Sequence, residues 1–65
     1  MIEVGDGTWI GARSTIMPGV KIGMGCVIGA GSLVTKDCED FGLYVGVPAR
    51  LVRKLSMEEL LMGRA

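Results

Sequence analysis

The chain has 65 residues, seven basic and seven acidic side chains, and a formal net charge of zero. A chain of this length buries only about 60% of the surface that it exposes when unfolded, so its core usually needs support from disulfides, metal ions or partner chains. The neutral balance argues against binding to duplex DNA, and the absence of histidine excludes an imidazole general base, a Ser/His or Cys/His pair and a histidine zinc site.

The N-terminal residues Met1-Ile2-Glu3 lack a basic stretch that leads into an apolar one, so we expect no secretory signal. No later run approaches the roughly 18 unbroken apolar residues of a membrane span. The sequence therefore predicts a cytoplasmic protein with neither a nucleic-acid partner nor a membrane partner.

A period of six residues organises most of the chain. Every sixth residue is a β-branched aliphatic: Val4, Ile10, Ile16, Ile22, Ile28 and Val34. A second position in the same period holds small residues: Thr8, Ser14, Val20, Cys26, Ser32 and Cys38. Six residues suffice for one short strand and one turn, and β-branched side chains pack well on a pleated surface. The pattern therefore predicts an all-β parallel coil of short strands.

Three such units close a triangular coil of 18 residues, so residues 18 apart should stack at the spacing of neighbouring strands, about 4.8 Å. The expected stacks are Val4 on Ile22, Ile10 on Ile28, Ile16 on Val34, Thr8 under Cys26, Ser14 under Ser32 and Val20 under Cys38. Residues 4–39 then make about two coils with an open N-terminal edge. Because solenoids generally need three or more units and capped ends, we expect partner chains.

The period ends after Asp37, and other elements follow. In chain order we expect an exposed loop at 39–42, a returning strand at 43–45, a turn at 46–49 and an extended segment at 51–52. Ser56-Met57-Glu58-Glu59 fits a capping box that opens a short helix. The expected organisation is a hexapeptide-repeat β-helix with a returning strand over 1–55 and a short C-terminal helix over 56–65.

Five motifs carry a family resemblance: Trp9-Ile10-Gly11-Ala12, Pro18-Gly19-Val20, Ile28-Gly29-Ala30-Gly31-Ser32, Thr35-Lys36-Asp37 and Gly46-Val47-Pro48-Ala49-Arg50. In order and spacing they resemble the C-terminal section of hexapeptide-repeat acetyltransferases of the galactoside, maltose and xenobiotic types. The resemblance implies a left-handed parallel β-helix assembled as a homotrimer. It also implies acetyl-CoA in the groove between neighbouring prisms, with a hydroxyl or amine of a sugar or antibiotic as the acceptor.

The resemblance further implies six coenzyme contacts: Ala12, Ala30, Thr35, Lys36, Arg50 and Arg53. The two alanines would occupy turns where a small side chain lets the pantetheine arm reach the backbone, and the Thr-Lys pair would lie near the end of that arm's groove. The two arginines would meet the phosphates, which prefer guanidinium forks. Trp9 resembles a tryptophan that walls the acceptor side of the site.

Two departures from the family pattern limit what the resemblance implies. The family's catalytic histidine lies in an upstream coil, often of the adjacent subunit, and this chain has no histidine. General-base catalysis typically contributes 10²–10⁴-fold, so we expect little catalysis from this chain alone and assign it no catalytic or metal-binding residue. Cys38-Glu39-Asp40 stand where the family usually has prolines, which leaves the path of that loop open.

Each candidate residue also has a structural interpretation. Trp9 suits packing in a trimer interface as well as a ligand wall. Lys36 and Arg50 suit solvated charges at the rim, and Arg53 with Lys54 suits charges that keep a sheet edge soluble.

The cysteines and acidic turn residues point to structure rather than chemistry. Cys26 and Cys38 share the inward register but fall on different faces, so we expect small core residues without a bridge, consistent with a reducing compartment. A catalytic thiol lacks a candidate base. Asp6 and Asp37 fit turns better than an acid/base pair.

Two functions therefore remain. The first is a trimer-forming, acetyl-CoA-binding section of an acetyltransferase with little catalysis of its own. The second is a structural oligomerisation module without a ligand, which rests on the open edge and the apolar surface. In either case two trimers are expected to pair through their N-terminal coils, because an uncovered parallel edge invites pairing.

Overall fold

The computed structural model describes residues 1–56 and residue 58. Six strands of two residues come first: β1 (Glu3–Val4), β2 (Trp9–Ile10), β3 (Thr15–Ile16), β4 (Lys21–Ile22), β5 (Val27–Ile28) and β6 (Leu33–Val34). Two longer strands follow, β7 (Gly42–Gly46) and β8 (Ala49–Lys54). The helix expected over 56–65 falls almost entirely outside the described residues. Within those residues, no helix has the length and apolarity that a bilayer crossing requires.

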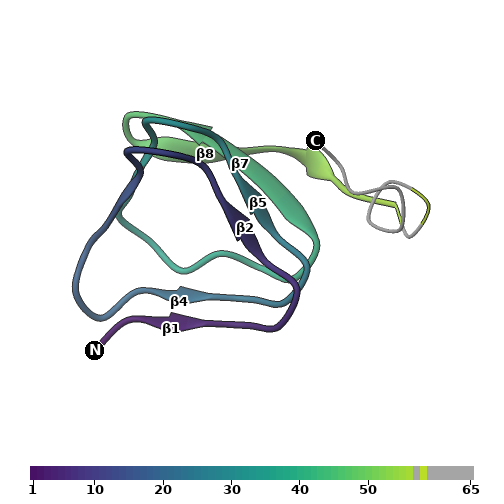
Figure 1. Cartoon of the computed structure of the whole chain (residues 1–65), viewed down its shortest axis with the longest axis horizontal. Coiled ribbons are helices and arrows are strands. Elements are labelled where there is room, and N and C mark those ends of the chain that lie inside the picture. Colours follow the sequence, from purple (N-terminus) through teal and green to yellow (C-terminus); the bar gives the residue numbers. More distant parts are fainter. Residues whose placement is uncertain (57, 59–65) are drawn as a thin grey trace.

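The first six strands wind twice around a triangle (Figure 1). They form three parallel pairs, β1 with β4, β2 with β5 and β3 with β6. The paired aliphatics are Val4 with Ile22, Ile10 with Ile28 and Ile16 with Val34, so the predicted stacking at 18 residues is confirmed. The coil is left-handed, against the right-handed rule for most crossover connections.

The core lies inside the second coil. Ile22 and Ile28 are only 3% and 1% exposed, because coils cover them on both sides. Their counterparts in the first coil, Val4 and Ile10, are 44% and 40% exposed. The hydrophobic core is therefore one coil deep, and it is open toward the N-terminal end of the prism.

Each of the five corners between β1 and β6 contains one residue with positive φ. These residues recur every six positions: Gly7 (73°), Arg13 (63°), Gly19 (85°), Gly25 (63°) and Gly31 (73°). Glycine adopts this conformation at little steric cost. The corners of successive coils are joined by backbone hydrogen bonds, because the N–H of Gly25 donates to the Asp6 carbonyl (2.9 Å) and that of Gly31 to the Ala12 carbonyl (2.8 Å).

The corner after β6 is two residues shorter than the corners before it, and this corrects one prediction. Cys38 pairs with Ile22, not with Val20, so the expected stack of Val20 under Cys38 is wrong. Four residues separate Val34 from Cys38, whereas six separate Ile16 from Ile22. Two carboxylates accept second-coil amides beside this shorter corner. The N–H of Lys21 donates to Oδ1 of Asp37 (2.8 Å), and the N–H of Met24 donates to Oδ1 of Asp40 (2.9 Å).

The other two small-residue stacks agree with the prediction. The N–H of Cys26 donates to Oγ1 of Thr8 (3.1 Å), so these two residues lie one above the other. The register of β3 on β6 brings Ser14 next to Ser32.

A returning hairpin covers one face of the third coil. β7 joins β5 in parallel, with Tyr44 beside Ile28, which confirms the strand predicted at 43–45. After the predicted turn at 46–49, β8 runs antiparallel to β7 and completes the sheet β2-β5-β7-β8. Tyr44 is buried and closes the core at the C-terminal end of the prism.

Candidate functional site

Two exposed alanines, Ala12 and Ala30, stack at the corner between the faces of β2/β5 and β3/β6; we call this the alanine corner. The second-coil turn lies directly on the first, because a Cβ on Gly11 would come within 2.5 Å of the Ala30 amide nitrogen. Gly11 therefore sets the close stacking of the two turns. At the repeat position that the two alanines share, the corner presents only methyl groups, and the exposed Arg13 follows Ala12 in the first-coil turn.

The turn between β7 and β8 lies on the same corner as its third layer. The N–H of Gly46 donates to Oγ of Ser32 (3.1 Å), and Val45 packs where a Cβ on Gly29 would be. Arg50 pairs with Val45 in the hairpin. The structure thus brings Arg50 to the alanine corner. Ser32 accepts this hydrogen bond and so anchors the turn, but the sequence predicted it only as a small inward residue. Its hydroxyl group was the one sign that it could accept a hydrogen bond.

Thr35 and Lys36 lie at the next corner of the prism. Both follow β6 directly and both are exposed. The alanine corner and the Thr35–Lys36 corner therefore flank one face, whose outward side chains are Thr15 and Leu33. Four of the six predicted coenzyme contacts therefore lie along the two edges of one face, whose own outward side chains are uncharged. The other two are the arginines of β8.

Arg53 lies apart from Arg50, because β8 spans the whole face of its sheet. Arg53 pairs with Leu43 at the far end of the hairpin, and its Nη1 donates to the Lys54 carbonyl (3.4 Å). The structure does not bring the two arginines together.

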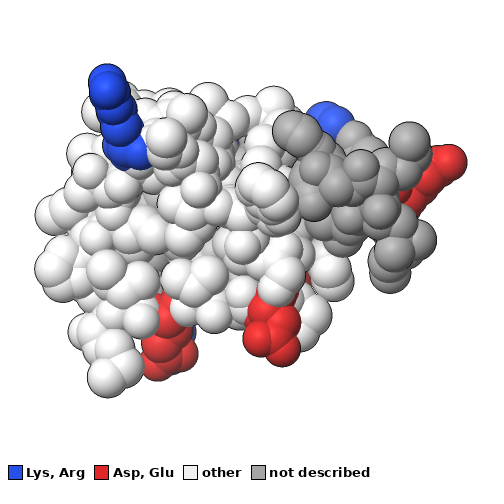
Figure 2. Space-filling model, in the orientation of Figure 1, with Lys and Arg blue, Asp and Glu red and all other residues white. Residues whose placement is uncertain are grey.

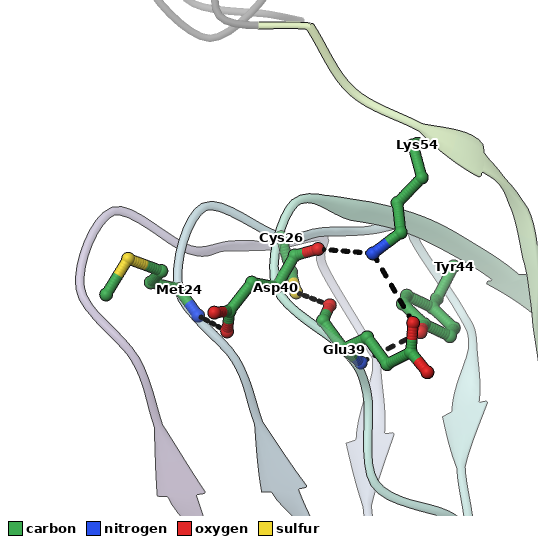
Figure 3. A network of polar contacts seen from close by, with 6 residues as sticks. All are labelled: Met24, Cys26, Glu39, Asp40, Tyr44 and Lys54. Atoms are coloured by element: carbon green, nitrogen blue, oxygen red, sulfur yellow. Dashed lines mark hydrogen bonds and ion pairs between the residues drawn. The ribbon is translucent and has the colours of Figure 1, made fainter.

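Lys54 closes the third coil rather than serving only as a solvated edge charge. Its Nζ donates to the Asp40 carbonyl (2.7 Å) and lies 3.4 Å from Oε1 of Glu39 (Figure 3). The same short loop is held from inside, since the Glu39 N–H donates to Oη of Tyr44 (2.9 Å) and Sγ of Cys26 donates to the Glu39 carbonyl (3.0 Å). This network fixes the loop whose path the sequence left open.

Trp9 lies on the outside of the prism. It is 60% exposed and stands in one row with Val27 and Leu43 on the outer side of β2, β5 and β7. An exposed apolar row of this kind suits contact with a neighbouring molecule or with a ligand. Both interpretations of Trp9 therefore stay predictions.

The two cysteines are buried and free, as expected of small core residues. Burial raises the pKa of Cys38 to about 11, and the neighbouring Cys26 and Asp37 add to the rise. Since the thiolate is the reactive form of cysteine, Cys38 is an inert thiol at neutral pH.

Charged side chains are sparse on the open end of the prism. Figure 2 shows this end in the orientation of Figure 1, with the first coil toward the viewer and charged groups confined to the margins. The described residues contain no cluster of three or more His, Cys, Asp or Glu side chains suited to a metal ion.

Comparison with known proteins identifies relatives for most of the chain. A family model described as bacterial transferase hexapeptide (six repeats) matches residues 1–36. A chloramphenicol acetyltransferase of Klebsiella aerogenes is 46% identical over 56 residues, which cover 86% of this chain and 27% of the relative. The chain thus spans less than a third of the length of the curated relatives that it matches.

Solved structures agree with the architecture. A galactoside acetyltransferase in complex with coenzyme A superposes with a TM-score of 0.85 at 45% identity, over 89% of this chain and 29% of that one. A hexapeptide-repeat acetyltransferase from Vibrio cholerae O1 biovar eltor, complexed with acetyl coenzyme A, gives a TM-score of 0.83 at 40% identity, over 85% and 30%.

Proposed function

The chain belongs to the bacterial transferase hexapeptide family, and from that premise we propose that it forms the acetyl-coenzyme A side of an acetyltransferase site. The acceptor would be a hydroxyl or amine of a sugar or antibiotic, as the names of the relatives suggest. The chain supplies no histidine, so the general base of the transfer would come from outside it.

The alanine corner is the observation that carries this proposal. Ala12 and Ala30 place small side chains one above the other in two stacked turns, and an extended amide such as pantetheine needs access to backbone donors and acceptors. Repeat positions at the other corners hold larger residues, for example Met24 six residues before Ala30. Among the corners that the structure describes, the alanine corner alone has a small side chain at this repeat position in both coils.

Arg50, Lys36 and the corner's own Arg13 lie around the face next to this corner. Arg50 follows the turn that lies on Ala30, and Lys36 stands at the opposite edge of the face. We assign Arg50 to the coenzyme phosphates, since a guanidinium fork binds phosphate in a bidentate manner. Arg53, at the far end of β8, would meet the coenzyme only through a neighbouring chain.

We further propose that the chain assembles as a homotrimer in the cytoplasm and that two trimers pair through their first coils. The outer row of Trp9, Val27 and Leu43 gives one face the apolar character of a subunit contact. In such a trimer the coenzyme would lie between two prisms, with Trp9 near the acceptor.

Calorimetric titration of coenzyme A into the purified chain tests the coenzyme proposal. We expect binding tighter than millimolar, and at least a tenfold loss in Ala30→Leu, because the larger side chain blocks the stacked turns. Met24→Leu is the matched control, since it changes the same repeat position at another corner and should bind like the original chain. Absence of heat and of measurable affinity in the original chain would overturn the proposal.

The alternative function is an oligomerisation module without a ligand. The specific observation that favours it is the exposed first coil, whose inward aliphatics Val4 and Ile10 remain about half uncovered. A chain that assembles but does not bind coenzyme A would support this second function.

A further inference from the structure

Hydroxyl groups at one repeat position join each layer of the prism to the next. Oγ1 of Thr8 donates to the Gly23 carbonyl of the second coil (2.7 Å). Oγ of Ser14 donates to the Gly29 carbonyl of the same coil (3.0 Å). Ser32 occupies this repeat position in the second coil, but the layer that its hydroxyl contacts is the turn between β7 and β8. The hydroxyl of Ser32 therefore bonds to the hairpin, where its counterparts bond to a coil.

Ser32 is buried beneath this turn. It is only 1% exposed, and its Oγ accepts the N–H of Gly46 (3.1 Å). Gly46 has a φ of 116°, and a Cβ there would lie 3.2 Å from the Pro48 carbonyl oxygen, so the turn requires glycine at this position. The hydrogen bond from Gly46 to Ser32 thus holds the residue at which β7 ends and the turn begins.

The turn determines where Arg50 lies. Gly46 pairs with Ala49 at the base of the turn, and the next pair of the hairpin joins Val45 to Arg50. Because opposed residues of an antiparallel pair share one side of the sheet, the Arg50 side chain leaves the hairpin beside Val45, which packs on Gly29. A shift of the turn would therefore move the guanidinium group relative to the alanine corner.

We infer that Ser32 is a positioning residue for coenzyme binding, because its hydroxyl holds the turn in the place from which Arg50 reaches a phosphate of the coenzyme. The inference rests on the proposed coenzyme function and adds to it a residue that does not touch the ligand. Ser32 is buried inside the prism, so it acts on binding only through the turn. Without the hydroxyl, the Gly46 N–H loses its acceptor and the turn is free to move away from the corner.

Calorimetric titration of coenzyme A into variants of Ser32 tests this role. Ser32→Ala removes the acceptor, and we expect coenzyme A to bind at least about fivefold more weakly, as the loss of one hydrogen bond implies. Ser32→Thr keeps a hydroxyl and should bind within about twofold of the original chain. Ser14→Ala is the matched control, because it removes a hydroxyl from the same stack that bonds to a coil and not to the hairpin. It should also bind within about twofold.

Ser32→Cys provides a second variant in case Ser32→Ala does not fold. Cys26 stands at the same repeat position at another corner, so a thiol fits this place in the core, but sulfur is a weak acceptor. We expect a loss of affinity similar to that of Ser32→Ala, with circular dichroism showing that each variant is folded. A folded Ser32→Ala or Ser32→Cys protein that binds coenzyme A as tightly as the original chain would overturn the role of Ser32.

A double-variant cycle with Arg50 separates positioning from a general loss of structure. Arg50→Gln removes the guanidinium group and should weaken coenzyme A binding about tenfold. If Ser32 acts through Arg50, adding Ser32→Ala to this variant weakens binding by less than about twofold. Losses that multiply would overturn the positioning role and make Ser32 a structural residue. An original chain that binds no coenzyme A would instead overturn the proposed function, and the role of Ser32 with it.

Discussion

The first and second coils carry the same residue pattern but differ in what lies above them. Ile10 and Ile28 occupy equivalent positions in paired strands, and their exposed fractions are 40% and 1%. The difference arises because the hairpin of β7 and β8 and the loop at 38–41 cover the second coil, whereas the first has a covering coil on one side only. The repeat thus determines which side chains point inward, and the neighbouring coil determines whether they form a core.

The largest expected effect comes from truncating the two isoleucines. Ile28→Ala removes a fully buried side chain and should lower the free energy of unfolding by about 2–5 kcal/mol, as core truncations do. Ile10→Ala should cost less than about 1.5 kcal/mol in dilute solution, because water already contacts its side chain. Urea unfolding at two protein concentrations measures both.

Protein concentration distinguishes the stability costs of the two variants further. If a second copy covers the first coil, the cost of Ile10→Ala should grow with protein concentration, whereas that of Ile28→Ala should stay constant. Equal costs for the two variants in dilute solution would contradict the difference between the coils.

The stability of the covered end should also depend on pH. In the unfolded chain the Cys38 thiol ionises near its ordinary pKa of 9.0, whereas in the folded chain burial holds its pKa at about 11. Stability from this group is therefore complete below pH 9 and is lost as the pH rises to 11, by about 2 kcal/mol. Urea midpoints measured from pH 8 to 11 check the loss.

Cys38→Ala provides the control for this pH dependence. The variant lacks the titrating thiol, so its decline between pH 9 and 11 should be smaller by the same amount. An identical decline in both proteins would show that another group causes it.

The sequence predicted the coils better than it predicted the site. Six-residue periodicity determines which strands pair, so Val4, Ile10 and Ile16 were placed correctly against the second coil. The shortened corner after β6 was missed because the contacts that accompany it are long-range. Nothing near Asp37 or Asp40 in the chain shows that their carboxylates accept from second-coil amides.

The arginines illustrate the same limit at the candidate site. The turn at 46–49 was predicted from its Gly and Pro, and this places Arg50 near the alanine corner. The separation of Arg53 depends on how far β8 continues along β7. That length is set by cross-strand pairing with Leu43 and Gly42, which local sequence does not reveal.

The smallest expected change in stability comes from the corners of the coil. There, one substitution in each coil tests the same backbone conformation. Gly31 and Arg13 stack at one corner with φ angles of 73° and 63°, yet only the second coil uses glycine there. A Cβ on Gly31 would meet nothing within 4 Å, so Gly31→Ala should lower stability by about 1 kcal/mol through backbone conformation alone. Arg13→Gly should raise stability by a similar or smaller amount in dilute solution, because it removes the same conformational cost. If urea unfolding gives changes in stability of opposite sign for the two variants, the corner conformation, and not side-chain contact, sets the preference for glycine. If both variants lose stability, the Arg13 side chain stabilises the single chain by more than its backbone strain costs.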